Sequence, residues 1–113
     1  MTRFTVIIPH RGDPALLQRA LSSVPDGLEV LVQEDLEGLG AGWARNQALP
    51  KATGKWLLFL DSDDYFTPEA LRLMEKHADD PAEVVYFSVR SVDSERGEPS
   101  ARQDAKLHYL ARY

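Results

Sequence analysis

The sequence predicts an open, mostly parallel α/β sheet with helices on both faces. Apolar runs typical of strands alternate along the chain with segments of helical periodicity, and the connections between them are short. Three of those runs end in polar or charged residues, as strands do in sheets that bind ligands beyond their carboxyl ends. The 113 residues, 43% hydrophobic and 27% charged, suit a single domain with its own core.

The first part of the chain contains two predicted strands with a helix between them. Residues 4–8 form a β-branched, apolar run that is predicted to be a buried strand stopped by Pro9. A helix follows, with Asp13 as its N-cap and apolar residues at three- and four-residue steps as far as Val24. The second strand is predicted over residues 28–32 and runs into polar residues.

The middle of the chain contains a glycine loop, a short helix and an apolar strand. Residues 38–42 predict a flexible loop, and residues 43–49 predict a helix broken by the following proline. Residues 56–60 are apolar without alternation, as expected of a central strand covered on both faces. This strand stops at the acidic segment 61–64. Because parallel strands end at the same edge, we expect the polar residues after all three strands to share one rim.

The last part of the chain is predicted to add two helices and a strand. A helix begins at Thr67, a cap followed by proline, and ends near residues 79–81. A strand is predicted over residues 84–92 and a turn over residues 94–97. The pattern of residues 105–112 predicts a final helix.

Composition excludes several classes of protein. The absence of cysteine excludes disulfides, thiolate zinc sites and cysteine nucleophiles. A net charge of -5 argues against a nucleic-acid partner, because phosphates would repel the chain. No apolar run approaches the roughly 20 residues of a membrane helix, and no secretory signal is visible. We therefore expect a cytoplasmic protein without a transmembrane segment.

Three carboxylates within four positions, those of Asp61, Asp63 and Asp64, are the strongest candidates for chemistry. Their mutual repulsion would raise their pKa values unless a cation or hydrogen-bond donors lie among them. Mg²⁺ or Mn²⁺ takes oxygen ligands of this kind, and one or two protein carboxylates suffice to hold it. The alternative is a solvated acidic turn next to the helix that begins at Thr67.

The glycine loop fits neither of the two common phosphate-binding motifs. The dinucleotide fingerprint requires a glycine where Trp43 stands, and a Walker A loop fails on both sides of Lys55. The remaining hypothesis is that Arg45 and Asn46 meet phosphate or sugar oxygens, and the alternative is a surface arginine at a helix start. His10 lies on the expected rim, where a loop hydrogen bond competes with a role in binding or as a base.

Three motifs in this order resemble the inverting family-two glycosyltransferases of the GT-A fold. Residues 4–9 match the opening strand and proline of that family, residues 44–46 match its Ala-Arg-Asn helix, and residues 53–64 closely match its Thr-Gly, apolar-strand and Asp-x-Asp signature. The resemblance implies a Rossmann-like, GT-A type sheet in truncated or minimal form. The expected organisation is one nucleotide-sugar-binding domain over 1–113, with a glycosyltransferase-like part over 4–92 and a tail over 93–113 whose structure is left open.

The resemblance also implies roles for individual residues. Asp63 would be the main ligand of Mn²⁺ or Mg²⁺, with Asp61 at the metal or the ribose, and Asp35 would read the uracil edge. The metal would bridge the two phosphates and take up charge on the departing nucleotide. The residues expected to bind the nucleotide sugar are Pro9, His10, Arg11, Glu34, Asp35, Arg45, Asn46, Asp61 and Ser62.

Two departures from the family pattern bear on function. The acidic stretch after the second strand is altered and leads almost directly into the glycine loop, so base recognition is expected to differ. The acceptor-binding half and its general base have no match, and the catalytic base stays unidentified among the tail carboxylates. The carboxylates concerned are Asp93, Glu95, Glu98 and Asp104. The chain is therefore expected to be a fragment or a pared-down member, and apolar surface bared by the missing half gives the hypothesis of a homo-oligomer.

The resulting function is transfer of a sugar from a nucleotide diphosphate, UDP above all, to a glycan or lipid-linked acceptor. The resemblance implies polysaccharide synthesis at the inner face of the cytoplasmic membrane. One alternative is a non-catalytic module of the same fold that binds nucleotide or a partner protein, which sugar transfer or donor hydrolysis would exclude. Another is a Mg²⁺-dependent phosphohydrolase, which would release phosphate from simple phosphomonoesters.

Overall fold

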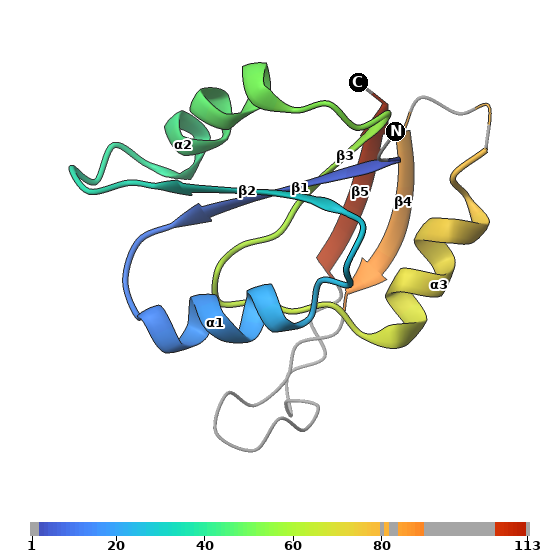
Figure 1. Cartoon of the computed structure of the whole chain (residues 1–113), viewed down its shortest axis with the longest axis horizontal. Coiled ribbons are helices and arrows are strands. Elements are labelled where there is room, and N and C mark those ends of the chain that lie inside the picture. The colour runs from blue at the N-terminus through green and yellow to red at the C-terminus, as the bar shows by residue number, and fades with distance from the viewer. Residues whose placement is uncertain (1–2, 80, 82–83, 90–105, 113) are drawn as a thin grey trace.

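Five strands form one sheet in the order β2-β1-β3-β5-β4 (Figure 1). The computed structural model describes residues 3–79, 81, 84–89 and 106–112. The elements in chain order are β1 (Phe4–His10), α1 (Pro14–Ser22), β2 (Glu29–Glu34), α2 (Ala41–Ala48), the 3-10 turn η1 (Leu49–Lys51), β3 (Trp56–Phe59), α3 (Pro68–Lys76), β4 (Val84–Val89) and β5 (Lys106–Arg112).

The direction of the strands confirms an open, mostly parallel sheet. β1 lies between β2 and β3 and pairs with both in parallel. β5 runs antiparallel to both of its neighbours, β3 and β4. Of these five strands, β1, β2, β3 and β4 therefore share one direction, and β5 runs in the opposite direction.

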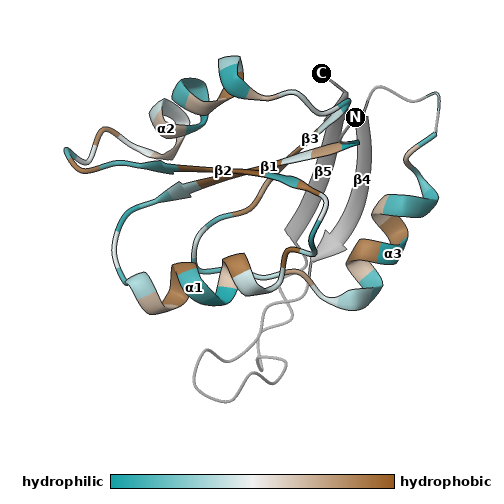
Figure 2. Ribbon diagram, in the orientation of Figure 1, coloured by the Kyte–Doolittle hydropathy of each residue, from teal (hydrophilic) through white to brown (hydrophobic). Residues whose placement is uncertain are grey.

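Helices cover both faces of the sheet, as the sequence predicted. In Figure 1, α1 and α3 lie on one side of the strands and α2 on the other. Alternate residues of β1 supply the two cores: Phe4, Val6 and Ile8 pack with residues of α1 and α3, whereas Ile7 packs with the end of α2. Figure 2 shows the apolar colour of β1 and of patches on α1 and α3. All seven residues of β1 are buried, and so are the first three residues of β3, the central strand, as expected of strands covered on both faces.

Two helices begin with a side-chain cap followed by a proline. The Asp13 carboxylate accepts a hydrogen bond of 2.8 Å from the Ala15 N–H at the start of α1. The Thr67 hydroxyl accepts one of 3.1 Å from the Ala70 N–H at the start of α3. Both predicted helix starts are confirmed, because each cap satisfies an N–H group that has no partner inside the helix.

The prediction of a helix over residues 105–112 is wrong. This segment is β5, which pairs with Trp56–Leu58 of β3 on one side and with Val84–Val89 of β4 on the other. Pairing with two strands that are distant in sequence outweighs a weak local preference for helix. The predicted turn over 94–97 and the end of the predicted strand over 84–92 lie outside the described residues.

Pro9 does not stop the first strand, contrary to the prediction. β1 continues to His10, and Pro9 stands opposite Gln33 of β2. Ile7 bonds toward β3, since its carbonyl accepts from the Leu60 N–H at 2.9 Å. Pro9, two residues on, faces the same side, where β3 has already ended, so its missing N–H breaks no ladder bond.

Other boundaries shift by a few residues from the predicted ones. β2 covers Glu29–Glu34 and so includes the polar end of the predicted strand. α2 begins at Ala41, inside the glycine loop, and η1 carries the chain through the proline that was expected to break the helix. α3 ends at Lys76, before the predicted end. Within the described part of the chain, no helix is long and apolar enough to cross a membrane.

A hydrogen-bonded tie joins three segments at the amino ends of the parallel strands. Glu29 of β2 accepts hydrogen bonds from the Thr5 hydroxyl at 2.8 Å and from the Thr53 N–H and hydroxyl at 2.8 and 2.7 Å. The Gly54 N–H donates to the Thr5 hydroxyl at 2.8 Å. These bonds, led by that from the Thr53 hydroxyl, lower the pKa of Glu29. The tie fixes the strands relative to one another at the edge opposite the polar rim.

Candidate functional site at the carboxyl edge of the sheet

The carboxyl ends of β1, β2 and β3 meet at one edge of the sheet. His10 at the end of β1 stands opposite Glu34 at the end of β2, and the Asp35 N–H donates to the His10 carbonyl at 2.9 Å. On the other side of β1, β3 ends beside Ile7 and leads directly into the acidic segment. The shared rim follows from the parallel strands.

Residues 61–64 form a turn, here called the aspartate turn. The Asp64 N–H donates to the Asp61 carbonyl at 2.9 Å, which closes the turn. As a result, Asp61, Asp63 and Asp64 each offer a carboxylate oxygen, and these oxygens lie within 4.8 Å of one another. Ser62, between the first two, is partly buried in the turn. Three carboxylate oxygens at this spacing fit a hard divalent cation such as Mg²⁺ or Mn²⁺, which prefers oxygen ligands.

Arg45 of α2 reaches the aspartate turn from one face of the sheet. Its guanidinium lies 3.0 Å from a carboxylate oxygen of Asp61 and 5.6 Å from the centre of the Phe59 ring. The Arg45 side chain is 34% exposed, and its Nε is buried without a hydrogen-bond partner in the described part of the chain. The arginine therefore has an unused donor beside the rim, whereas Asn46, next to it on α2, is exposed.

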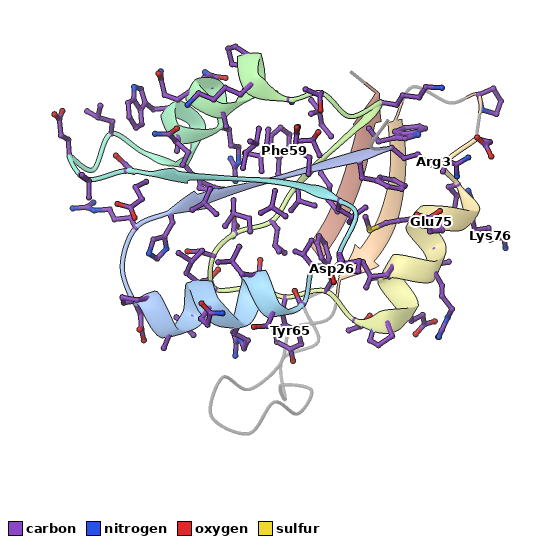
Figure 3. The ribbon with its side chains drawn as sticks, in the orientation of Figure 1. Arg3, Asp26, Phe59, Tyr65, Glu75 and Lys76 are labelled. Atoms are coloured by element: carbon purple, nitrogen blue, oxygen red, sulfur yellow. The ribbon has the colours of Figure 1, made fainter. Side chains whose placement is uncertain are left out.

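Arg19 of α1 reaches the same turn from the other face of the sheet. Its guanidinium donates to the carbonyl of Asp63 at 2.7 Å and lies 4.8 Å from the centre of the Tyr65 ring. In Figure 3 the Phe59 side chain lies on the α2 side of the sheet and Tyr65 beside α1. Arg19 was not among the predicted site residues, because helical periodicity only assigns it to a polar face and says nothing of a turn 44 positions away.

Asp35 organises the loop between β2 and α2. Its carboxylate is buried and accepts hydrogen bonds from the Leu39 and Gly40 N–H groups at 2.7 and 2.8 Å. The bond from Gly40 is the largest cause of a lowered pKa for Asp35, and the charge of Arg11 lowers the pKa further. Gly38 has a φ of 71°, and a Cβ added there would lie 2.6 Å from the Arg11 guanidinium. The loop and Arg11 are therefore packed together by Asp35.

The remaining predicted residues lie along the same rim. Pro9 and His10 end the buried strand β1, and His10 Nδ1 is buried with no hydrogen-bond partner among the residues that the structure describes. Glu34 is exposed at the end of β2, and Arg11 is exposed in the next loop. The structure thus pairs Arg45 with Asp61, whereas Arg11 acts on Asp35 through its charge.

The four tail carboxylates considered as general bases lie outside the described residues. These are Asp93, Glu95, Glu98 and Asp104. None of them is therefore assigned as the general base.

Known proteins resemble this chain in sequence. The chain is 39% identical over 66 residues to the succinoglycan biosynthesis protein ExoO of Rhizobium meliloti, a match that covers 58% of this chain and 18% of that protein. It is 33% identical over 103 aligned residues to ExoW of the same organism, covering 63% of this chain and 32% of ExoW. A TPR repeat-containing protein of Synechococcus elongatus is 29% identical over 119 aligned residues, covering 87% of this chain and 29% of that protein. The chain thus spans at most about a third of these relatives.

A solved structure shares the fold. The crystal structure of S. aureus TarS, residues 1–349, superposes with a TM-score of 0.60 and 24% sequence identity, covering 73% of this chain and 34% of TarS. The likeness supports the GT-A type sheet that the family resemblance implied.

The family model for glycosyl transferase family 2 matches residues 25–112, which include the aspartate turn and extend through β5. That match covers well over half of the chain. It agrees with the succinoglycan biosynthesis proteins among the relatives and with the fold of TarS. The chain belongs to glycosyl transferase family 2.

Proposed function

We propose that this chain is the nucleotide-sugar-binding part of an inverting glycosyltransferase that uses a UDP-sugar. One observation carries the proposal: the aspartate turn at the carboxyl edge of the sheet, with three carboxylates within 4.8 Å and an arginine paired to one of them. Asp61 and Asp63 would hold Mn²⁺ or Mg²⁺, as acidic oxygen ligands suit these ions. When bound, such an ion acts as a Lewis acid toward the diphosphate leaving group.

The side chains around the turn have separate roles in this proposal. Arg45 would bind the diphosphate through its partly exposed guanidinium, and Asn46 lies next to it on α2. Pro9, Arg11 and Glu34 would line the rim toward the nucleotide, and His10, whose Nδ1 is buried, would support the rim from the end of β1. Ser62 would contact ribose or phosphate from within the aspartate turn.

Asp35 is proposed to accept a hydrogen bond from the uracil base of the nucleotide while it also binds the loop. Both of its oxygens accept loop N–H groups, so a uracil edge would share an oxygen that is already hydrogen-bonded. A carboxylate oxygen has two lone pairs and can accept a second bond.

The acceptor and the place of action are proposed from the relatives. ExoO and ExoW are succinoglycan biosynthesis proteins, which supports a growing polysaccharide or lipid-linked glycan as the acceptor. Action at the inner face of the cytoplasmic membrane stays a prediction. Membership of the glycosyltransferase family favours sugar transfer over the phosphohydrolase alternative.

Self-association also stays a prediction. Large apolar side chains are exposed around the β2–α2 loop, among them Leu36 at 85% and Leu39 at 54%. Such side chains favour contact with another surface. Light scattering on the purified chain at two concentrations tests this, and a monomer at both would remove the hypothesis.

Calorimetric titration tests the binding function. UDP and then UDP-glucose are titrated into the chain with Mn²⁺ and, separately, with EDTA. We expect binding only with the metal, and a loss of at least about tenfold in affinity for Asp63→Asn, or about 1.4 kcal/mol. The matched control is Asp26→Asn, which changes the net charge equally at an exposed position before the amino end of β2, away from the rim.

The outcomes separate the candidate functions. Metal-dependent UDP binding that Asp63→Asn weakens and Asp26→Asn preserves supports the proposal. Equal binding in EDTA would remove the metal from it, and failure of UDP, GDP and dTDP to bind the folded chain would overturn nucleotide binding. Transfer or slow hydrolysis of UDP-glucose then distinguishes an enzyme from a non-catalytic module.

A further inference from the structure

α1 contacts the segment that leaves the aspartate turn at two points. The Arg19 guanidinium donates to the Asp63 carbonyl at 2.7 Å, and the Ser23 hydroxyl accepts from the Phe66 N–H at 2.9 Å. Arg19 and Ser23 are four residues apart, so they lie on the same face of the helix. The Ser23 hydroxyl also donates to the Ala20 carbonyl at 2.6 Å, which fixes its orientation. One face of α1 therefore binds the main chain on both sides of Tyr65.

The Arg19 contact depends on the shape of the guanidinium. The group lies over the Tyr65 ring, 4.8 Å from its centre, while its terminal nitrogen donates to Asp63. A planar guanidinium stacks on a ring and keeps its donors in a fixed plane, which a lysine ammonium cannot do. The Nε of Arg19 is buried, although the residue as a whole is partly exposed.

The bond to the Asp63 carbonyl bears on the carboxylates. That carbonyl belongs to the peptide between Asp63 and Asp64, so fixing it limits the directions in which both side chains leave the main chain. Across the sheet, Arg45 fixes the carboxylate of Asp61 directly. Two guanidinium groups also offset the repulsion among three clustered carboxylates.

We propose that Arg19 is a positioning residue that holds the aspartate turn in the geometry that binds a divalent cation. It acts through the Asp63 main chain and touches neither the cation nor the nucleotide. The inference rests on the proposed function, since it assumes that the turn binds the cation.

Two substitutions separate shape from charge at this position. Arg19→Gln removes the charge and the stack, and Arg19→Lys keeps the charge but loses the planar group. Loss of a residue that orients metal ligands costs about 10- to 100-fold in metal affinity. We expect Arg19→Gln to weaken Mn²⁺ binding at least about tenfold and Arg19→Lys to recover only part of that loss.

The experiment measures Mn²⁺ affinity of the full chain in the presence of UDP, by the loss of the free-ion signal in electron paramagnetic resonance. Circular dichroism and the melting temperature establish that each variant is folded at the temperature used. Arg72→Gln and Arg72→Lys, at an exposed arginine of α3, are the matched controls and should leave the affinity unchanged. If Arg19→Gln does not fold, the Mn²⁺ affinity of Arg19→Lys alone tests the proposal.

Each outcome bears on the proposal. Weakened Mn²⁺ binding in a folded Arg19→Gln variant that Arg19→Lys recovers only in part, with unchanged Arg72 controls, supports it; where Arg19→Gln does not fold, weakened binding in Arg19→Lys does so. Affinity within twofold of the unmodified chain in both variants overturns it, and full recovery by lysine overturns positioning in favour of charge alone. If the unmodified chain binds no Mn²⁺, the proposed function fails as well, whereas normal binding with insensitive Arg19 variants defeats only this inference.

Discussion

Gly54 occupies a position where a side chain has no room. A Cβ built there would lie 2.6 Å from both the main-chain nitrogen and the hydroxyl of Thr5, and 2.7 Å from the carbonyl carbon of Phe4. The Gly54 N–H needs this close approach in order to donate to Thr5. The Thr-Gly pair that carried part of the family resemblance is therefore required by the packing, because it brings the start of β3 against the start of β1.

Gly54→Ala is expected to destabilise the fold by about 3 kcal/mol, the upper end of the usual cost of overpacking, because the obstacle is main chain that cannot rotate away. Urea unfolding measures the change. Gly42→Ala is the matched control, since a Cβ on Gly42 meets nothing within 4 Å and alanine favours the helix. Equal stability of the two variants would contradict the packing argument.

At the scale of elements, the Glu29 tie makes strand association depend on pH. Its hydrogen bonds from Thr53 and Thr5 lower the pKa of Glu29 in the folded chain. A carboxyl whose pKa falls on folding contributes stability that is fully present above its unfolded pKa, about 4.3, and is lost as the pH drops through the folded value. Asp35, whose pKa is lowered as well, acts in the same direction.

Glu29→Gln is therefore expected to cost about 1 kcal/mol at pH 7, the usual net contribution of one hydrogen bond, because the amide keeps one acceptor oxygen and loses the charge. The difference between the variant and the original chain should shrink as the pH falls from 5 toward 3, because the original carboxyl becomes neutral too. Urea unfolding at several pH values measures both trends. A difference that stays constant down to pH 3 would show that ionisation of Glu29 is irrelevant to stability.

Elements that depend on local signals were predictable from the sequence, and elements that depend on distant pairing were not. Asp13 and Thr67 satisfy helix N–H groups within a few residues, so the starts of α1 and α3 could be predicted. The strand β5 is stabilised by partners far away in the chain, which local periodicity cannot detect. Pro9 misled the prediction because its effect depends on where the neighbouring strand ends.

In the candidate site too, the features that follow from local sequence were predictable and those that depend on distant contacts were not. The aspartate triplet and the rim follow from residue type and strand direction, so both could be predicted. Arg45 was also predicted at the site, but its pairing with Asp61 and the contact of Arg19 with Asp63 could not be predicted, because both depend on how the helices pack on the sheet. The two oxygens of Asp35 are likewise occupied by N–H groups that only the folded loop presents.

For the molecule as a whole, ligand binding should appear as added stability. A ligand that binds only the folded chain raises the free energy of unfolding by about 2.7 kcal/mol at 100 times its dissociation constant. In a domain of this size that corresponds to a rise of about 10 °C in the melting temperature. We expect this rise with UDP and Mn²⁺ together, measured by circular dichroism.

The same melting experiment in EDTA, or with Asp63→Asn, should show little rise. Asp26→Asn should behave like the original chain. A rise of equal size in EDTA would mean that UDP binds without the metal, and an equal rise in Asp63→Asn would mean that it binds without the Asp63 carboxylate.

The aspartate turn also connects the two covers of the sheet. α1 lies on one face and α2 on the other, and each sends one arginine to the same four-residue segment. The turn is therefore anchored to both covers, so a displacement of α1 would move the main chain at Asp63 relative to the Asp61 carboxylate, which is paired with α2. A ligand that fixes the spacing of the carboxylates would in turn restrict movement of α1 relative to α2.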